Sequence, residues 1–272
     1  IAVSSNLQGA ATLVGDTTAI MLGSALNMTF MDFFWYHGRP SIFFAVELGA
    51  LLSAAIIYVL FRKEKASVHG FGQMTQVSDY MPTFLLGGMV VLLICASFAP
   101  DSWNLPPETN GIICCALLLI GLIYNTVRKK TVKAVLGPLN AIDFETLGLL
   151  VGLFLMIGGI THEGVIDALA HLLVELGGGN LFLMYTLIVW ASVLISAFID
   201  NIPYVATMIP VIAGIAAEMG VDSTALYFGL LSGATLGGNC TPIGASANIA
   251  GIGILRKEGY QVANKDFFRI GI

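Results

Sequence analysis

The sequence has few charged residues. Asp, Glu, Lys and Arg make up 11% of its 272 residues, against about a quarter in a soluble globular domain. Hydrophobic residues make up 57%, and the mean hydropathy is +0.86. So few charges do not cover the surface of a soluble protein of this size, whereas lipid solvates an apolar exterior. We therefore predict an all-α polytopic membrane protein.

Basic residues and cysteines are also scarce, and their placement excludes several functions. The Lys and Arg residues cluster in short loops, so there is no broad basic face and no nucleic acid is expected as a partner. The cysteines, Cys95, Cys114, Cys115 and Cys240, lack a metal-ligand spacing and suit a membrane core. Neither Gly-x-Ser-x-Gly nor His-Glu-x-x-His occurs, which argues against an intramembrane protease. We expect no enzyme activity and no cofactor.

Apolar stretches long enough to cross roughly 30 Å of hydrocarbon recur along the chain. The uninterrupted ones are Ser41–Phe61, Pro82–Phe98, Gly111–Val127, Phe144–Ile160, Leu181–Ile199 and the less regular Ile202–Met219. Leu7–Gly23 and Ala225–Leu255 are interrupted by polar residues and glycines, and Val165–Leu176 has the pattern of an interfacial amphipathic helix. The stretch Leu181–Met219 is either a re-entrant hairpin or two full crossings.

The Lys and Arg residues indicate how these spans are oriented, because cytoplasmic loops are rich in both. Threading the spans alternately places eleven of the twelve on one side and only Arg39 on the other. The eleven are Arg62, Lys63, Lys65, Arg128, Lys129, Lys130, Lys133, Arg256, Lys257, Lys265 and Arg269. We predict that this side is cytoplasmic.

Two segments near the ends of the chain resemble each other. Leu7–Ile20 aligns with Leu236–Ile249 at an offset of 229 residues, with five identities in fourteen positions. By the charge count, the chain after the first copy lies outside and the chain after the second lies inside, so the copies cross the membrane in opposite senses. An inverted-topology repeat with two interrupted helices is typical of secondary transporters.

The residues at the interruptions suit an ion site. Breaking a membrane helix frees backbone N–H and C=O groups that lipid does not satisfy, and the half-helix ends add partial charges. Thr12 in the first interruption, and Asn239, Thr241, Ser246 and Asn248 in the second, supply side-chain oxygens. We interpret the two interruptions as a dehydrated ion site. The alternative is close helix packing through small residues.

Acidic residues within apolar surroundings are costly and are generally functional. Asp200 and Asn201 precede Pro203 at the expected hairpin tip, and Asp16 lies inside the first interruption. A carboxylate at either place can bind Na+ or carry a proton. We predict a Na+ position at Asp200 and Asn239. The alternative for Asp200 is a helix cap.

Three segments resemble signatures of the ion transporter superfamily. They are Ser5–Asp16 (SNLQGAATLVGD), Phe198–Pro210 (FIDNIPYVATMIP) and Gly237–Asn248 (GGNCTPIGASAN). The chain is similar over essentially its whole length to the branch that holds arsenite permeases, NhaD-type Na+/H+ antiporters and the melanosomal P protein, often grouped with citrate transporters.

The resemblance implies an elevator-type carrier, often dimeric, with a scaffold domain and a mobile transport domain. We assign residues 1–40, a broken helix and an interfacial helix, and residues 144–272 to the transport domain, and residues 41–143 to the scaffold. The implied binding site comprises Asn6, Thr12, Asp16, Asp200, Asn201, Asn239, Thr241, Ser246 and Asn248. Because the chain looks cut at both ends, we expect it to be part of a longer polypeptide.

Several functions remain open at this point. The leading hypothesis is secondary transport coupled to H+ or Na+, as cation/proton antiport or arsenite-type efflux. Uptake of di- or tricarboxylates is the alternative within this class. An ion channel is the alternative outside it, although the inverted repeat favours alternating access. We expect a multi-pass homodimer in a bacterial or archaeal plasma membrane, with lipid and a small ion or molecule as its partners.

Overall fold

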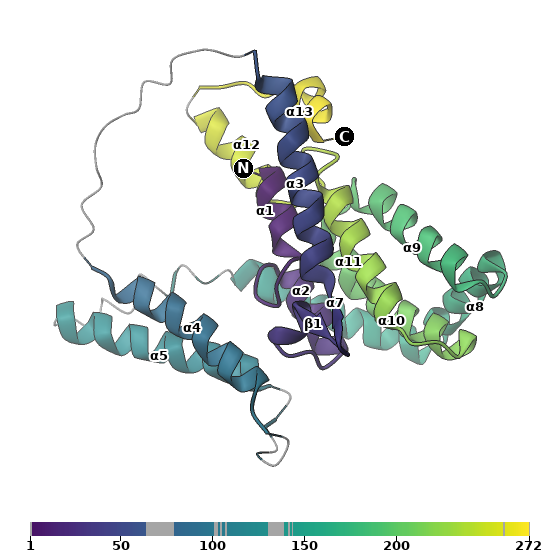
Figure 1. Ribbon diagram of the computed structural model, residues 1–272, viewed down its shortest axis with the longest axis horizontal. Helices are drawn as coiled ribbons and strands as arrows, with labels where there is room; N and C mark the ends of the chain where they lie inside the picture. The colour runs from purple at the N-terminus through teal and green to yellow at the C-terminus, as the bar shows by residue number, and fades with distance from the viewer. Residues whose placement is uncertain are drawn as a thin grey trace.

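The computed structural model is almost entirely helical (Figure 1). It describes residues 2–63, 79–100, 103, 105–106, 108–129, 139–140, 142, 144–257 and 259–271. Within these ranges the strands are β1 (Trp35–Tyr36) and β2 (Arg39–Pro40), which form one short antiparallel pair. The predicted all-α architecture is confirmed.

Among the described residues, four helices are long and apolar enough to cross a membrane: α3 (Ile42–Phe61), α5 (Thr109–Lys129), α7 (Phe144–His162) and α10 (Asn201–Met219). α4 (Met81–Ser97) is apolar but shorter. Buried residues make up 44% of the apolar window of α10, 11% of that of α3 and none of that of α5. α10 therefore lies inside the protein, whereas α3 and α5 present apolar surface that lipid solvates. The multi-pass membrane architecture is confirmed.

α8 (Val165–Gly177) and α9 (Leu181–Ser196) form a bent pair, with 117° between their axes. Gly178 and Gly179 have positive φ angles, which favour glycine, and the side chain of Asn180 caps α9 by accepting hydrogen bonds from two backbone amides. α8 packs against α10 through a face that includes Ile166 and Ala170, as its amphipathic pattern predicts. The bend is therefore encoded by the sequence Gly178-Gly179-Asn180.

Small residues allow α9 to pack closely against α11 (Thr224–Gly238). Gly229, Gly233 and Gly237 recur every fourth residue on the face of α11 that meets α9. A β-carbon at Gly233 would lie 2.5 Å from the carbonyl oxygen of Val189, and one at Gly237 would overlap the carbonyl of Val193. These glycines let the two backbones touch, as in other membrane helix pairs.

The two helix breaks have the same construction. In the first, α1 (Ala2–Gly9) is followed by α2 (Thr17–Ala25), and in the second, α11 ends at Gly238 and α12 (Ser246–Lys257) begins eight residues later. The helix end at Gly9 and the helix start at Thr17 are each 229 residues before their equivalents in the second break. A β-carbon at Gly15 would lie 2.5 Å from the Gly9 carbonyl oxygen, and one at its equivalent Gly244 would lie 2.9 Å from that of Gly238.

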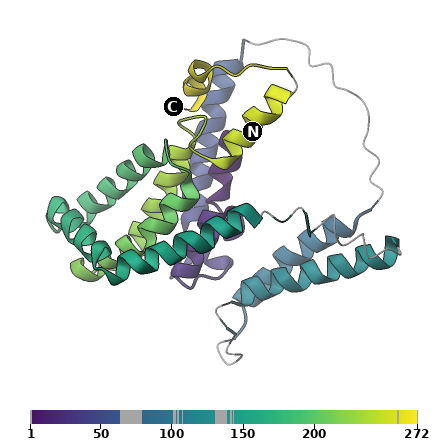
Figure 2. The same ribbon diagram turned by 180° about the vertical axis from the view of Figure 1, so that it is seen from behind.

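The repeat is also inverted in space. α1 runs toward the end of the molecule where β1 lies, and α11 runs away from that end (Figures 1 and 2). The interrupted helices and the inverted repeat predicted from the sequence are therefore confirmed.

The turn between α9 and α10 lies beside the second break. A β-carbon at Gly244 would lie 2.9 Å from the carbonyl oxygen of Ser196 and 3.0 Å from that of Ala197. The hydroxyl of Thr241 donates a hydrogen bond to the same Ala197 carbonyl. The α9–α10 hairpin thus turns at the level of the break, while the chain continues past it in α12. This arrangement suits a re-entrant hairpin, although α10 is also long and apolar enough to cross a membrane, so both alternatives from the sequence stand.

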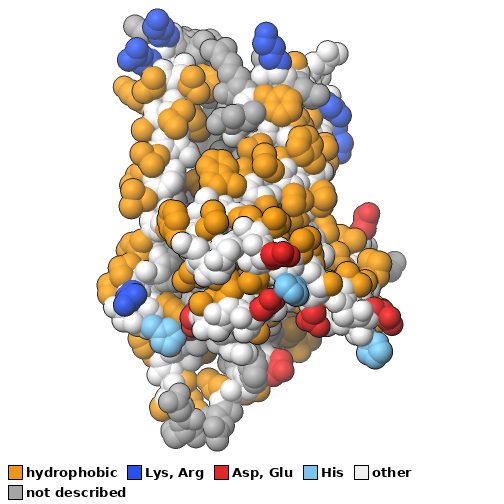
Figure 3. Space-filling model, turned by 90° about the vertical axis from the view of Figure 1, so that its right-hand side faces the viewer, with side chains coloured by type: hydrophobic (Ala, Val, Ile, Leu, Met, Phe, Trp, Pro, Cys, Tyr) orange, Lys and Arg blue, Asp and Glu red, His pale blue; other side chains and the backbone are white. Residues whose placement is uncertain are grey.

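The basic residues that follow α3 and lie on α12 agree with the predicted orientation. The C-terminal ends of α3 and α12, which precede Arg62 and carry Arg256, lie at the same end of the molecule (Figure 1). In Figure 3, most Lys and Arg side chains gather at that end, an apolar belt follows, and the acidic and His side chains lie beyond it. Three of the predicted cytoplasmic residues, Lys65, Lys130 and Lys133, lie outside the described residues.

The interfacial helix predicted within residues 1–40 is wrong. The chain after α2 instead forms a three-residue 3₁₀ turn, η1 (Met31–Phe33), and the β1–β2 hairpin. Asp32 accepts hydrogen bonds from the amide and hydroxyl of Thr29, which closes the 3₁₀ turn, and the positive φ angles of His37 and Gly38 form the hairpin turn. A short amphipathic helix, α13 (Asn264–Gly271), follows α12.

Candidate ion site at the helix breaks and the hairpin tip

Three asparagines form a buried amide network between the two breaks. The Nδ2 of Asn6, on α1, donates to Oδ1 of Asn239 at 2.9 Å and to Oδ1 of Asn248 at 3.1 Å. The Nδ2 of Asn248 donates to the carbonyl oxygens of Gly238 at 2.6 Å and Thr241 at 2.9 Å. All three asparagines are at most 5% exposed. The network therefore ties the first broken helix to the second and satisfies carbonyls that the second break leaves free.

Asp16 links the first break to the hairpin tip. Its carboxylate caps α2 by accepting a hydrogen bond from the Thr17 amide at 2.6 Å, and it also accepts one from the Thr18 hydroxyl at 3.3 Å. The side-chain amide of Asn201, at the start of α10, donates to the same carboxylate at 3.3 Å. Asp16 is half-buried, so its charge lies at the edge of the protein interior.

Asp200 links the hairpin tip to the second break. Its carboxylate caps α10 by accepting a hydrogen bond from the Ile202 amide at 3.0 Å. The hydroxyl of Ser246, the first residue of α12, donates to Asp200 at 2.6 Å. The helix cap that the sequence left as an alternative for Asp200 is therefore present, together with a contact to the second break.

The electrostatics follow from this convergence of helix ends. The N-termini of α2, α10 and α12 meet around Asp16, Asp200 and Ser246. Helix N-termini carry partial positive charge and interact favourably with anionic groups. Among the residues that the structure describes, no Lys or Arg takes part in these hydrogen bonds. The arrangement can bind a cation between the carboxylates, or an anion at the helix ends.

Most of the predicted site residues take part in hydrogen bonds between the breaks and the hairpin. One group joins Asn6, Asn239 and Asn248, a second joins Asp16 and Asn201, and a third joins Asp200 and Ser246. Thr241 is bonded to the hairpin turn. Thr12 lies in the first break, but its side chain has no hydrogen bond to the other site residues within the described structure. Asp200 and Asn239, the predicted Na+ position, are not bonded to each other either, because Asn239 pairs with Asn6.

Buried hydroxyls on the hairpin are part of the site's support, and sequence reasoning missed them. Ser196 donates to the Ala234 carbonyl at 2.8 Å, and Ser192 shares a hydrogen bond of 3.0 Å with Tyr204 across the hairpin. The signal was available, since Ser192 and Ser196 are one helical turn apart on the face of α9 that meets the glycines of α11. A hydroxyl buried in a helix contact needs a partner.

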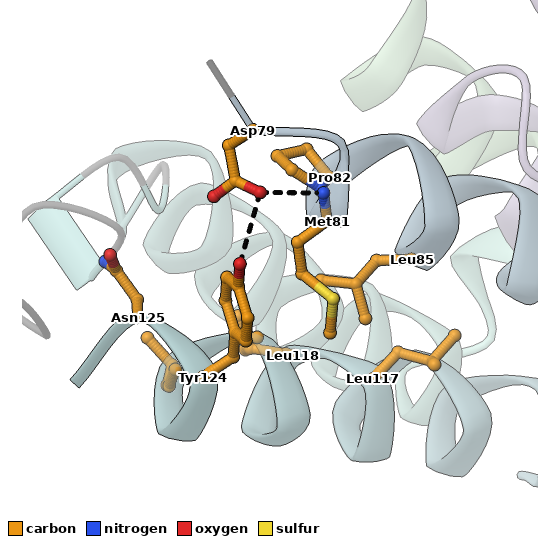
Figure 4. A pocket seen from close by; sticks show the side chains of 10 residues that line it. Asp79, Met81, Pro82, Leu85, Leu117, Leu118, Tyr124 and Asn125 are labelled. Atoms are coloured by element: carbon orange, nitrogen blue, oxygen red, sulfur yellow. Dashed lines mark hydrogen bonds between the residues drawn. The ribbon is translucent and has the colours of Figure 1, made fainter. Parts of the chain in front are cut away.

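A cavity of about 310 Å³ lies apart from this network, between α4 and α5 (Figure 4). Its walls are mostly apolar, including Leu85, Leu117 and Leu118. At its polar end, Asp79 accepts hydrogen bonds from the Met81 amide at 2.9 Å and the Tyr124 hydroxyl at 3.3 Å and forms an ion pair with Arg128. The Met81 bond and the Arg128 charge lower the pKa of Asp79.

Comparison with known proteins identifies the family of this fold. The family model described as citrate transporter matches residues 1–233 and, in a second overlapping match, residues 139–272. The chain belongs to the citrate transporter family. Both helix breaks and the α9–α10 hairpin lie inside the matched residues. The hydrogen-bonded site described above is therefore part of the family's domain.

Uncharacterized transporters are similar to this chain over nearly its whole length. An uncharacterized transporter of Mycobacterium tuberculosis is 32% identical over 271 residues, which are 98% of this chain and 61% of that protein. An uncharacterized transporter of Synechocystis is 26% identical over 298 residues, which are 98% of this chain and 62% of that protein. This chain therefore spans about three fifths of the length of these relatives.

The human P protein is similar over a shorter stretch. It is 37% identical over 140 residues, which are 49% of this chain and 17% of that protein. The resemblance to the P-protein and citrate-transporter branch inferred from the three sequence signatures is confirmed.

Proposed function

We propose that the chain forms the larger part of a secondary transporter that couples its cycle to a small cation, H+ or Na+. One observation supports this most directly: Asp16 and Asp200 come from different repeats, and Asn201, the residue after Asp200, donates a hydrogen bond to Asp16. Among the described residues, no basic side chain takes part in the hydrogen bonds of either carboxylate. Two carboxylates without a basic partner attract a cation. The leading versions are cation/proton antiport and arsenite-type efflux.

The helix ends explain how the site releases its cation. Each carboxylate also caps a helix N-terminus, whose partial positive charge offsets part of its negative charge when the cation leaves. Because the hairpin tip contributes Asp200 and Asn201 and both breaks contribute the remaining groups, a movement of the hairpin opens the site. The elevator mechanism and the division into a transport domain and a scaffold of residues 41–143 remain predictions.

The test uses the full-length protein in proteoliposomes with an internal pH dye, to which Na+, Li+ or arsenite is added. Asp200→Asn is informative because Asn caps helices as well as Asp does, so the variant keeps the cap and loses only the charge. We expect proton movement in response to one of these ions, at least about tenfold slower in the variant.

A matched control is Asp222→Asn. Asp222 accepts a hydrogen bond from the Thr224 amide at 2.8 Å near the start of α11, outside the network, so this variant should transport like the wild type. A wild-type protein that moves none of these ions, or an Asp200→Asn variant as active as Asp222→Asn, would contradict a cation site at the hairpin tip.

Transport of a di- or tricarboxylate is the second candidate. It is favoured by the three helix N-termini at the site, which suit an anionic substrate, and by the family name. In the same vesicles, a response to citrate that requires Na+ or H+ would select this candidate. We also expect a homodimer in a bacterial or archaeal plasma membrane, and cross-linking of the protein in native membranes checks its oligomeric state.

A further inference from the structure

Two apolar helices reach the β1–β2 hairpin at one end of the molecule. α3 begins directly after β2, and the amide of Ser41, which precedes α3, donates to the Phe34 carbonyl oxygen at 3.0 Å. α4 ends beside η1, just before the hairpin, because the Met31 amide donates to the hydroxyl of Ser97, the last residue of α4, at 3.2 Å. The hairpin therefore lies where the apolar helices end, at the opposite end of α3 from Arg62 (Figure 1).

One face of α3 is apolar and exposed along the whole helix. Phe44, Leu48, Leu51 and Tyr58 are separated by four, three and seven residues, which places them on one side of a helix. Each of these side chains is at least 43% exposed. In a helix that crosses a membrane, lipid covers such a face. The face that meets lipid therefore runs from the first turn of α3 to its last.

The ring of Trp35 extends this face beyond the start of α3. It meets the Phe44 ring edge-on, with the ring centroids 6.2 Å apart, and it is 53% exposed. Tryptophan is enriched where hydrocarbon gives way to lipid head groups, because its ring is apolar and its N–H group needs an acceptor. The place of Trp35, at the end of a lipid-facing helix, has both of these properties.

Arg39 supplies a positive charge at the same hairpin. Trp35 lies opposite Pro40 in the strand pair and Tyr36 lies opposite Arg39, so the two pairs are on opposite faces of the hairpin. Arg39 is exposed, and within the described part of the chain no carboxylate forms an ion pair with it. A guanidinium group binds phosphate through parallel N–H bonds. The hairpin thus presents an apolar ring and a phosphate-binding cation on its two faces.

Packing holds the hairpin in place against the protein interior. The Phe33 side chain is fully buried, and a β-carbon at Gly23 of α2 would lie 3.4 Å from its ring. The Phe34 ring packs on the Phe43 ring of α3, with their centroids 4.5 Å apart. Trp35 follows these two residues directly, so it stays exposed unless this packing is broken.

We propose that the β1–β2 hairpin anchors the protein to phospholipid head groups. Trp35 and Phe44 lie among the outermost parts of the acyl chains, and Arg39 binds the phosphate of a phospholipid in the leaflet on the opposite side from Arg62. Two observations select lipid as the partner: the hairpin continues the lipid-facing side of α3, and Arg39 complements the charge of a phosphate. This inference does not depend on the proposed function.

The experiment measures the depth of Trp35 in the bilayer. The full-length protein, with Trp35 as its only tryptophan and every other one replaced by Phe, is placed in vesicles of phosphatidylcholine that is brominated either near the head group or near the chain end. Bromine quenches the fluorescence of a tryptophan that it contacts. We expect the lipid brominated near the head group to quench Trp35 about twofold more than the other lipid.

The matched control is Leu51→Trp in a protein whose own tryptophans, including Trp35, are all replaced by Phe. Leu51 lies on the same face as Phe44, halfway along α3. We therefore expect the opposite order for this variant, with stronger quenching by the lipid brominated near the chain end.

A second pair of variants tests the phosphate contact. Arg39→Gln removes the charge, and we expect iodide in the water to quench Trp35 about twofold more in this variant. Arg62→Gln, at the other end of α3, should leave the quenching of Trp35 unchanged. If the Arg39→Gln protein does not enter vesicles, the brominated lipids decide.

Quenching of Trp35 by iodide and by neither brominated lipid would place the hairpin in water and overturn the inference. Quenching by none of the three would show that protein covers Trp35, either another part of a longer chain or a second copy, and would overturn it as well. Iodide quenching that Arg39→Gln leaves unchanged would reject the phosphate contact. The transport assay tests the proposed function separately, and its outcome does not affect the anchor.

Discussion

The second helix break and the α4–α5 hairpin differ in how they satisfy polar groups. Around the break, Asn239, Thr241 and Asn248 are buried and bonded to residues distant in the sequence. α4 and α5 meet through apolar side chains, and their ion pair, Asp79 with Arg128, lies partly exposed at one end. The stability of the break therefore depends on close packing and on complete hydrogen bonding. The stability of the α4–α5 hairpin depends on apolar contacts that lipid can replace.

The largest effect that sharpens this comparison comes from adding volume in each region. Gly233→Val forces a side chain against the Val189 carbonyl and the Ser192 β-carbon, 2.5 and 2.7 Å from the position of a β-carbon. We expect a loss of about 3 kcal/mol or more in the free energy of unfolding. Unfolding in detergent micelles, titrated with SDS, measures it.

The matched change in the other region is Gly88→Val on α4, where nothing lies within 4 Å of an added β-carbon. We expect less than about 1 kcal/mol of change, because the side chain meets lipid and a helix-weakening glycine is removed. Equal losses for the two valine variants would show that the regions do not differ in packing.

The next largest effect comes from removing the Asn6 side-chain amide, which donates hydrogen bonds from the first repeat to the second. Asn6→Ala leaves the side-chain oxygens of Asn239 and Asn248 buried without it, which we expect to cost about 2 kcal/mol. Gln8→Ala, at an exposed position of the same helix, should cost little. The same SDS titration compares the two variants. An Asn6→Ala variant as stable as Gln8→Ala would mean that water satisfies the asparagines in its place.

A smaller effect concerns the hydroxyl pair within the hairpin. Tyr204→Phe leaves the Ser192 hydroxyl buried without its partner at 3.0 Å, which we expect to cost about 1 kcal/mol. Tyr58→Phe on α3 is the control, since Tyr58 is 74% exposed. The comparison is wrong if both tyrosine variants unfold alike, because the hairpin would then tolerate an unpaired hydroxyl as well as the lipid-facing surface does.

Much of the fold could be predicted from the sequence because a membrane restricts the choices. Long apolar runs have to be helices, and residues such as Asn239 and Thr241 stand out where such a run should be uninterrupted. The equivalence of Gly9 with Gly238 was visible as a repeated pattern, and the structure gives both the same close approach to a second glycine. Local signals also predicted the hairpin tip at Asp200, where an acid precedes a proline.

The rest of the site depends on contacts that no local pattern shows. Asn6 and Asn239 are 233 residues apart, so their pairing follows only from how the repeats pack together. Whether Asn248 binds an ion or satisfies carbonyls of its own break depends on atomic distances. The interfacial helix expected within residues 1–40 is replaced by a tight turn, which the positive φ angles of His37 and Gly38 form.

The smallest effect depends on pH and concerns only the α4–α5 hairpin. The hydrogen bond from Met81 and the charge of Arg128 lower the pKa of Asp79 below its ordinary value, so ionised Asp79 stabilises the hairpin above the unfolded pKa of about 3.9. That stabilisation is lost as the pH falls through the lowered pKa. Unfolding temperatures measured from pH 7 down to pH 3 should show a decline that Asp79→Asn reduces, while Asp32→Asn, in η1, leaves the Asp79 contribution in place. A wild-type decline unchanged in Asp79→Asn would show that the acid sensitivity arises outside the α4–α5 hairpin, and the hairpin would then not be the region that sets stability at low pH.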